Sequence, residues 1–404
     1  MRLGLGAPVE HEDLEEFEQL ALSAGAEPVA TVTGRRERPD SRLFVGSGKA
    51  EEIRQAAEAS GADIVLMDHA LSPSQERNLE KLTGRRVLDR NALILDIFSQ
   101  RARSHEGKLE VELAQLRHIA SRLVRGWTHL ERQRGGLGKT GGPGEKQIEL
   151  DRRMISRRID HLRREMLRVD RSRDTRRRSR ETTPSAALVG YTNVGKSSLF
   201  NALTRAGVHV QDQLFATLDP TVRRVELGKR GIYLLKDTVG FIRKLPHHLV
   251  ASFRSTFEEA GEAELLVLVA DPSHPIGLEQ RDTALRVIDE TGLGDLPRVL
   301  VYNKADRLSP EQQRFLIERE PDAVIVSAHT GFGLDRLSEL LADRLLGREL
   351  SGTIYIPLDR GDLLAEAHRM ATVDAVEPDG GSLRLRLRAS RQVFNALQAR
   401  MKHA

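Results

Sequence analysis

The sequence predicts a multidomain α/β protein, and three observations lead to that prediction. At 404 residues the chain is too long for one ordinary hydrophobic core. Short apolar runs alternate with helical patterns both in the first hundred residues and after residue 185. Between these regions apolar residues recur at three- and four-residue steps, which is the pattern of long amphipathic helices.

The order of these patterns predicts five consecutive segments. In the N-terminal part, Pro28–Thr33 and Ile64–Met67 are the expected strands of an α/β unit. Apolar stripes from Leu109 to Leu130 and from Ile148 to Val169 predict a helical hairpin with a shared apolar seam. The expected segments are an N-terminal α/β subdomain (1–104), a long helical hairpin with a glycine-rich tip (105–175), a linker (176–184), a doubly wound domain (185–348) and a small α+β C-terminal domain (349–404).

Composition limits the classes of function. The chain has no cysteine, which excludes disulfides and thiolate metal sites, and its 13 histidines show no metal-binding spacing. The apolar run Leu265–Ala270 is far shorter than the roughly 20 residues that a membrane helix needs. The first residues, MRLGLGAPVEHEDLEEF, turn acidic before a signal-like apolar stretch can form. We expect a cytoplasmic monomer without a membrane span, and peripheral membrane association stays open.

Residues 190–197, GYTNVGKS, predict a phosphate-binding loop. They fit the pattern G-x-x-x-x-G-K-[ST] and lie between a predicted strand and a predicted helix. The glycines let backbone N–H groups wrap the phosphates, Lys196 reaches the β and γ oxygens, and the Ser197 hydroxyl takes a position on Mg²⁺. The sequence therefore predicts a nucleoside triphosphate site with Mg²⁺ as cofactor.

The residues expected around the γ-phosphate follow in the chain. Asp237-Thr-Val-Gly240 comes directly after a predicted strand, so Asp237 can hold a Mg²⁺-bound water and the Gly240 N–H can meet the γ-phosphate. The earlier stretch LFATLDPT, residues 214–221, offers Thr217 to Mg²⁺ and the γ-phosphate. Both stretches are predicted to respond to the nucleotide state.

Two motifs predict that the base is guanine. Asn303-Lys304-Ala-Asp306 follows a predicted strand, and a carboxylate there accepts from the ring N–H and the exocyclic amine of guanine. Adenine lacks both donors. Ser327-Ala328 follows the next strand and supplies backbone donors to the guanine oxygen.

All these motifs, in this order, predict a Ras-like doubly wound GTPase domain with GTP as substrate and GDP as product. The predicted catalytic residues are Lys196, Thr217 and Gly240, and the predicted Mg²⁺ ligands are Ser197, Thr217 and Asp237, the last directly or through a water. The predicted nucleotide-binding residues are Gly190, Tyr191, Thr192, Asn193, Val194, Gly195, Lys196, Ser197, Ser198, Phe215, Ala216, Thr217, Asp237, Thr238, Val239, Gly240, Asn303, Lys304, Asp306, Ser327, Ala328 and His329.

Two side chains beside these motifs are unusual for the chemistry. Phe241 stands where many GTPases carry a glutamine that orients the attacking water, and a phenyl ring cannot do this by hydrogen bonding. We therefore expect slow intrinsic hydrolysis, with the missing group supplied by a partner or another part of the chain. Lys236, directly before Asp237, brings a charge that points either toward the γ-phosphate or away from it.

The hairpin is strongly basic. From Arg152 to Arg180 there are 13 arginines against four acidic residues, which is typical of contact with a polyanion. The stretch GGLGKTGGPGEKQ, residues 135–147, fits neither a dinucleotide turn nor a phosphate loop, because a helix precedes it and Gln133 stands where a glycine is needed. We expect it to be the tip of the hairpin, where glycines let the backbone approach RNA. The predicted contacts are Gly135, Gly136, Gly138, Lys139, Gly142, Gly144, Lys146, Arg152 and Arg153.

Several stretches outside the phosphate loop carry a resemblance to a known family. They are VLDRNALILDIFSQRA (87–102), HEGKLEVELAQL (105–116), LVRGWTHLER (123–132), GGLG (135–138), GPGE (142–145), DRR (151–153) and DTVGFI (237–242). With these stretches the chain resembles the HflX family of ribosome-associated GTPases over nearly its full length.

The resemblance implies a GTPase that binds the large (50S) ribosomal subunit and the 70S ribosome through ribosomal RNA. It implies hydrolysis that is slow alone and stimulated by ribosomes, and an N-terminal domain that dissociates stalled or idle ribosomes into subunits. A GTPase that assists assembly of the large subunit would share every motif. A further alternative is a nucleotide-driven RNA remodelling factor, suggested by FVGSGK (44–49), although Leu43 stands where a full phosphate loop needs glycine.

Overall fold

The computed structural model forms two compact units. The residues that it describes are 1–5, 11–125, 143–178, 183–204, 214–215, 217–218, 220–227, 230–243, 260–347, 350–389 and a few positions between 393 and 400. The first unit comprises 1–178, 211–219 and 242–255, and the second comprises 179–210, 220–241 and 256–404. Two short segments from the middle of the chain thus belong with the N-terminal residues. The predicted domain boundaries stay predictions.

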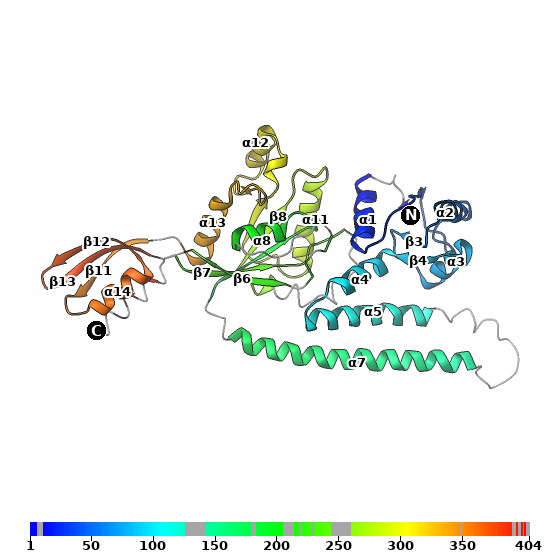
Figure 1. Ribbon diagram of the computed structural model, residues 1–404, viewed down its shortest axis with the longest axis horizontal. Coiled ribbons are helices and arrows are strands. Elements are labelled where there is room, and N and C mark those ends of the chain that lie inside the picture. The colour runs from blue at the N-terminus through cyan, green and yellow to red at the C-terminus, as the bar shows by residue number, and fades with distance from the viewer. Residues whose placement is uncertain are drawn as a thin grey trace. The chain divides into compact units, whose positions relative to one another are not determined.

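The N-terminal part of the first unit is an α/β subdomain (Figure 1). Strand β1 pairs in parallel with β2, and β3 pairs in parallel with β4. The strand expected at Pro28–Thr33 is wrong by several residues, because β2 begins only at Thr33, where it pairs with Arg2. The elements are β1 (Arg2–Leu5), α1 (His11–Ser23), β2 (Thr33–Arg36), α2 (Ser47–Ser60), β3 (Ile64–Met67), α3 (Pro73–Thr83), β4 (Arg86–Asp89) and α4 (Arg90–Arg101).

Capping residues explain where two of these helices begin. Ser72 and Gln75 form a reciprocal capping box at α3, with Pro73 in its first turn. The Asp89 carboxylate accepts from the backbone N–H of Ala92 and starts α4 directly after β4. Helix α4 therefore leaves the sheet edge without a loop.

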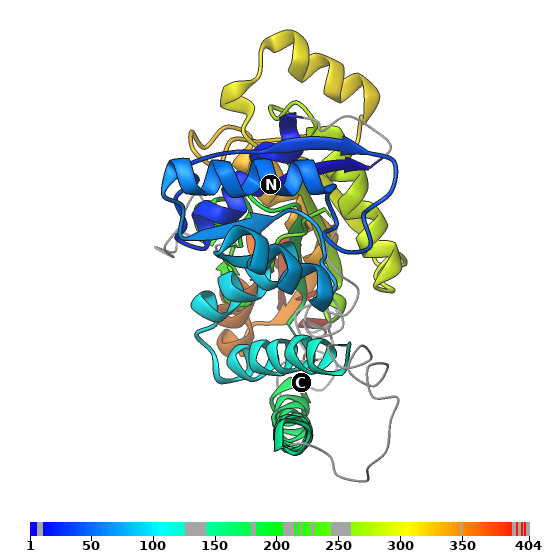
Figure 2. The same ribbon diagram turned by 90° about the vertical axis from the view of Figure 1, so that its right-hand side faces the viewer.

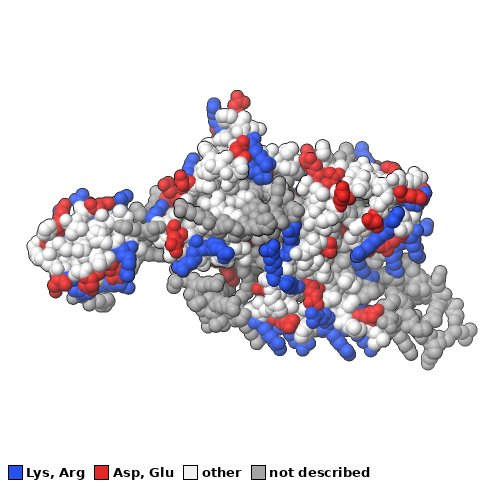
Figure 3. All heavy atoms as spheres, viewed as in Figure 1, with Lys and Arg blue, Asp and Glu red and all other residues white. Residues whose placement is uncertain are grey.

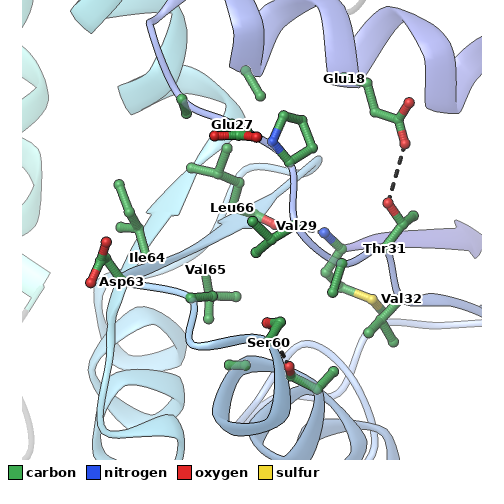
Figure 4. Close-up of a pocket in the computed structure, with 18 of the residues that line it drawn as sticks. Glu18, Glu27, Val29, Thr31, Val32, Ser60, Asp63, Ile64, Val65 and Leu66 are labelled. Carbon is green, nitrogen blue, oxygen red and sulfur yellow. Dashed lines mark hydrogen bonds between the residues drawn. The ribbon is translucent and has the colours of Figure 1, made fainter.

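A cavity of about 440 Å³ lies in this subdomain between α1, α2, β3 and residues 25–32 (Figure 4). Its wall is largely apolar, with Val29, Val32 and Val65 among the lining residues. The Thr31 hydroxyl donates to the Glu18 carboxylate across one side of the cavity.

The predicted helix pair is present, with α5 (His105–Arg125) beside α7 (Pro143–Arg178) (Figure 1). Their seam buries Leu109, Leu113 and Leu162, as the apolar stripes predict. Arg158 of α7 forms an ion pair with Glu112 of α5 at 2.7 Å. Helix α7 begins at Pro143, so the backbone of Gly144 and Lys146 belongs to its first turns. The remaining predicted tip contacts, Gly135, Gly136, Gly138, Lys139 and Gly142, lie outside the described residues.

The second unit contains the predicted doubly wound domain, and the fold-class prediction is confirmed. Its six-stranded sheet has the order β10-β9-β8-β5-β7-β6, parallel except for β6 against β7. Strands β5 and β8 are buried along their whole length, as expected for central strands covered on both faces. The strands are β5 (Ser185–Gly190), β6 (Thr221–Glu226), β7 (Ile232–Asp237), β8 (Leu265–Ala270), β9 (Arg298–Tyr302) and β10 (Val324–Ile325).

The described helices of this domain are α8 (Lys196–Thr204), α11 (Gly277–Glu290), α12 (Pro310–Arg319) and α13 (Leu334–Leu346). Helix α12 (yellow) stands out from the domain in both Figure 1 and Figure 2, and only Leu316 of this helix is buried. Parallel strands end at one edge of the sheet, where the loops after β5, β7 and β9 carry the nucleotide motifs.

The C-terminal residues form the expected small α+β domain. Its antiparallel sheet has the order β11-β13-β12, with α14 in contact with β12. Ile356, Leu385 and Leu387 are buried in its core. The elements are β11 (Leu350–Pro357), α14 (Gly361–Met370), β12 (Thr372–Asp379) and β13 (Ser382–Ala389). Among the described residues of the whole chain, no helix is long and apolar enough to cross a membrane.

Candidate nucleotide site

The predicted phosphate loop connects β5 to α8 at the carboxyl edge of the sheet. Gly195 has a φ of 90°, in the left-handed region that glycine tolerates. A Cβ atom at this position would lie 2.3 Å from Nδ2 of Asn303, so no other residue fits without displacing that side chain. The loop backbone therefore packs directly against the guanine motif.

Lys196 is buried at the centre of this loop. Its Nζ donates to the carbonyl of Tyr191 at 2.7 Å and to that of Gly190 at 3.2 Å. Burial lowers the pKa of Lys196 from 10.5 to about 8, opposed by the nearby Asp237 carboxylate. The ammonium is thus held beside the loop amides in a largely desolvated position, where phosphate oxygens would restore its lost solvation.

This lowered pKa predicts a pH dependence of nucleotide binding. Phosphate charges raise the pKa of Lys196 when nucleotide is bound. At a pH where Lys196 is deprotonated in the free protein, nucleotide binding is therefore coupled to the uptake of one proton. We expect GTP affinity to fall as the pH rises above about 8, by about tenfold per pH unit at most. Calorimetry at alkaline pH in two buffers of different ionisation enthalpy would measure the proton uptake. The terminal phosphate of GTP is fully ionised at alkaline pH and does not take up the proton. An absence of proton uptake would therefore contradict the placement of Lys196 beside the phosphates.

Two of the predicted Mg²⁺ ligands, Ser197 and Asp237, meet beside Lys196. The Ser197 hydroxyl donates to Oδ2 of Asp237 at 2.7 Å, and Asp237 is only 1% exposed. A hydroxyl and a carboxylate are the hard oxygen donors that Mg²⁺ prefers, alongside water and phosphate oxygens. The donor set of this part of the site therefore fits the predicted cation.

The segment after β7 is joined to the phosphate loop by two backbone hydrogen bonds. Thr192 N–H donates to the carbonyl of Phe241 at 2.7 Å, and Phe241 N–H donates to the carbonyl of Gly190 at 2.9 Å. A Cβ atom on Gly240 would lie 2.8 Å from both Nζ of Lys196 and Cα of Thr192, so the glycine allows this close approach. Phe241 is 3% exposed and packs as a core residue.

Lys236 turns out to have a structural partner. Its side chain is buried, and its Nζ lies 3.8 Å from a carboxylate oxygen of Glu262. The sequence leaves open whether this charge points toward the γ-phosphate or away from it, and the pairing with Glu262 supports the second alternative.

The guanine motif is held by contacts that lock its loop. Asn303 Nδ2 donates to the carbonyl of Val194 at 3.0 Å, and its Oδ1 accepts from the backbone N–H of Ala328. Lys304 has a φ of 62° and forms an ion pair with Asp271 at 2.7 Å. Asp271 was missed by the sequence analysis. Its position directly after the apolar strand β8, at the same sheet edge, was the available signal.

The carboxylate that the sequence predicts to read the base, that of Asp306, is exposed. The Ser327 hydroxyl donates to Oδ1 of Asp306 at 2.5 Å and is the main cause that lowers the pKa of this carboxyl. The exposed Asp306 carboxylate, like an ordinary aspartate, is ionised at neutral pH and presents an acceptor to solvent. His329 is exposed two residues beyond Ser327.

The structure does not bring all predicted site residues into one unit. The motifs at 190–198, 237–240, 303–306 and 327–329 belong to the second unit, whereas Phe215 and Thr217 belong to the first. Ala216 lies outside the described residues. Among the described residues, no cluster of three or more acidic or histidine side chains forms a metal site.

One edge of the sheet carries a lysine-bearing phosphate loop, a serine–aspartate pair and an Asn-Lys-x-Asp loop. This combination defines a guanine nucleotide-binding P-loop GTPase. Comparison with known families gives four matches along the chain, described as GTP-binding GTPase N-terminal (11–99), GTP-binding GTPase middle region (101–180), 50S ribosome-binding GTPase (185–304) and HflX C-terminal domain (315–404). The chain belongs to the HflX family of GTPases.

Individual relatives are similar in sequence to this protein over most of the chain. GTPase HflX of Escherichia coli K12 is 49% identical over 383 residues, which cover 93% of this chain and 90% of that protein. GTPase HflX of Magnetococcus marinus is 46% identical, covering 89% and 84%. A solved structure described as SsGBP with GDP matches at 25% identity and a TM-score of 0.49, covering 85% of this chain and 96% of that one.

Proposed function

We propose that this GTPase binds the large ribosomal subunit and uses its N-terminal unit to dissociate stalled or idle ribosomes into subunits in the cytoplasm. The match to a family described as 50S ribosome-binding GTPase supports the partner. The observation that carries the proposal is a basic helix pair built into the same chain as the nucleotide site. Mg²⁺ held by Ser197, Asp237 and Thr217 would neutralise phosphate charge during hydrolysis.

The charge on α7 supports an RNA partner. Its described arginines 152, 153, 157, 158, 163, 164 and 168 are all exposed. Figure 3 shows Lys and Arg side chains in blue along the lower margin, where Figure 1 draws α7. Some of these arginines have acidic partners, such as Arg153 with Glu149 at 2.8 Å, but exposed pairs are weak and exchange readily for phosphate.

Phe241 bears on how hydrolysis is regulated. Its buried ring offers no hydrogen bond to an attacking water. We infer that intrinsic hydrolysis is slow and that the ribosome stimulates it, by supplying or positioning the missing group. Turnover that is as fast without ribosomes as with them would contradict this inference.

The function is tested by mixing purified 70S ribosomes with the protein and a non-hydrolysable GTP analogue. We expect free subunits to increase in sedimentation profiles, with no increase when GDP replaces the analogue. Binding to the large subunit without subunit release would favour the alternative role in large-subunit assembly. Nucleotide binding by residues 1–180 alone would favour the RNA remodelling alternative.

The exposed arginines of α7 predict a salt-dependent complex. Replacing Arg152 and Arg157 with glutamine should weaken ribosome binding and reduce the slope of log affinity against log salt by about one unit per arginine. Arg314 and Arg319, exposed on α12, provide the matched control pair. The slopes are measured by pelleting at several salt concentrations. Equal slopes for the two double variants would show that α7 is not part of the RNA interface.

A further inference from the structure

The hydroxyl of Thr192 is a buried polar group that the contacts of the fold do not explain. Thr192 lies in the phosphate loop, two residues after Gly190, and is 5% exposed. Its Oγ1 is buried and has no hydrogen-bond partner among the described residues. Burying a hydroxyl without a partner costs free energy, so such a group in a folded protein requires an explanation.

Other threonines of the same domain show what a hydroxyl with a structural role looks like. Thr238 is 3% exposed, and its Oγ1 donates to the carbonyl of Leu188 at 2.6 Å. Thr204 and Thr291 donate to helix carbonyls, at 2.7 Å and 2.8 Å. The Thr192 hydroxyl differs from these because it has no such acceptor in the part of the chain that the structure describes. A structural role therefore does not account for it.

Hydrogen bonds fix the backbone that carries this hydroxyl. The N–H of Thr192 donates to the carbonyl of Phe241 at 2.7 Å. The preceding residue, Tyr191, forms a parallel β-bridge with the same Phe241. The carbonyl of the following residue, Asn193, accepts from Nζ of Lys304 at 2.9 Å. The Thr192 side chain is thus held in place by contacts on both sides of it along the chain.

The Thr192 side chain lies where the predicted γ-phosphate contacts meet. A Cβ atom built on Gly240 would lie 2.8 Å from Cα and from Cγ2 of Thr192, and 2.8 Å from Nζ of Lys196. The Gly240 N–H is predicted to contact the γ-phosphate, and Lys196 is predicted to reach the β and γ oxygens. Because Cγ2 and Oγ1 of Thr192 are bonded to the same carbon, its hydroxyl belongs to this group of donors.

We propose that the hydroxyl of Thr192 donates a hydrogen bond to a γ-phosphate oxygen and thereby makes the site favour GTP over GDP. An anionic oxygen only accepts, so the hydroxyl is the donor. Hydrogen bonds to charged groups are stronger than neutral ones, and this donor gives up no protein partner to form one. GDP lacks the γ-phosphate and leaves the hydroxyl unpaired. This role concerns the nucleotide site alone and does not depend on the proposed ribosomal partner.

The test compares Thr192→Val and Thr192→Ser with the unmodified full-length chain, without ribosomes. Valine keeps the branched shape and removes only the hydroxyl, whereas serine keeps the hydroxyl. Calorimetry with Mg²⁺ present measures binding of a non-hydrolysable GTP analogue and of GDP. We expect Thr192→Val to lower the affinity for the analogue by about tenfold to a hundredfold, with GDP affinity unchanged. Thr192→Ser should retain the affinity for the analogue.

Thr291→Val is the matched control, because it makes the same substitution in the same domain. Its hydroxyl donates to the carbonyl of Val287 at 2.8 Å, at the end of α11. We expect this variant to bind the analogue and GDP as the unmodified chain does.

Melting temperatures measured without nucleotide separate the proposed role from a structural one. Replacing an unpaired buried hydroxyl with a methyl group should leave the melting temperature of Thr192→Val equal to or above that of the unmodified chain. Equal losses of affinity for GDP and the analogue, together with a lower melting temperature, would show that the hydroxyl supports the fold, for example through a bound water. Unchanged affinity for the analogue would show that the hydroxyl does not contact the γ-phosphate. Either result overturns the proposal.

Discussion

Asp306→Asn is expected to move the nucleotide preference of this protein from GTP to xanthosine triphosphate. The Asp306 carboxylate is ionised at neutral pH, the Ser327 hydroxyl lowers its pKa further, and we expect it to accept from the ring N–H and the amine of guanine. The asparagine amide of the variant places its NH₂ group, a donor, opposite one of the two guanine donors. Two charge-assisted hydrogen bonds are lost, so GTP affinity should fall by roughly a thousandfold.

The same amide fits xanthine, which carries an acceptor oxygen where guanine carries its amine. Competition binding with GTP and xanthosine triphosphate measures both effects in one series. Asp322→Asn, which changes another exposed aspartate of the domain, should alter neither affinity. If GTP affinity survives in Asp306→Asn, then Asp306 is not the residue that reads the base.

The sequence predicted the nucleotide motifs well because each is a local pattern on a predictable strand end. Asp237 and Asn303 follow directly from the apolar strands that precede them, and parallel strands place their loops at one edge. The pairing of α5 with α7 was predictable for a similar reason, since Leu109, Leu113 and Leu162 lie on regular helical stripes.

Features that depend on distant contacts could not be predicted. Leu214 bonds to Ser23 across a sequence separation of 191 residues, and Arg90 meets Arg243 across 153. No periodic pattern in the sequence predicts such contacts. Strand β2 was misplaced because Pro28–Thr33 has the β-branched composition of a strand, whereas the polar Thr33–Arg36 is chosen by its register with β1. In both cases tertiary pairing overrides the local signal.

Lys196→Met should abolish hydrolysis while leaving the nucleotide-free fold nearly as stable as before. We expect the buried Lys196 cation to meet the β and γ oxygens, so its loss should slow hydrolysis by at least about a hundredfold. In the free protein the same ammonium is costly, since its pKa is lowered from 10.5 to about 8, which corresponds to roughly 3 kcal/mol of unfavourable environment for the charged form.

The sign of that stability effect follows from linkage. A lysine with a lowered folded-state pKa destabilises the fold below about pH 8, and this penalty disappears as the pH rises toward 10.5. Methionine removes the penalty at neutral pH but takes the Lys196 donor from the carbonyl of Tyr191, at about 1–3 kcal/mol, whereas the carbonyl of Gly190 keeps the Phe241 N–H as a donor. The two effects oppose each other, so the melting temperature without nucleotide should change little. Stabilisation by added GTP should vanish, whereas a large loss of stability without nucleotide would show that Lys196 chiefly holds the loop together.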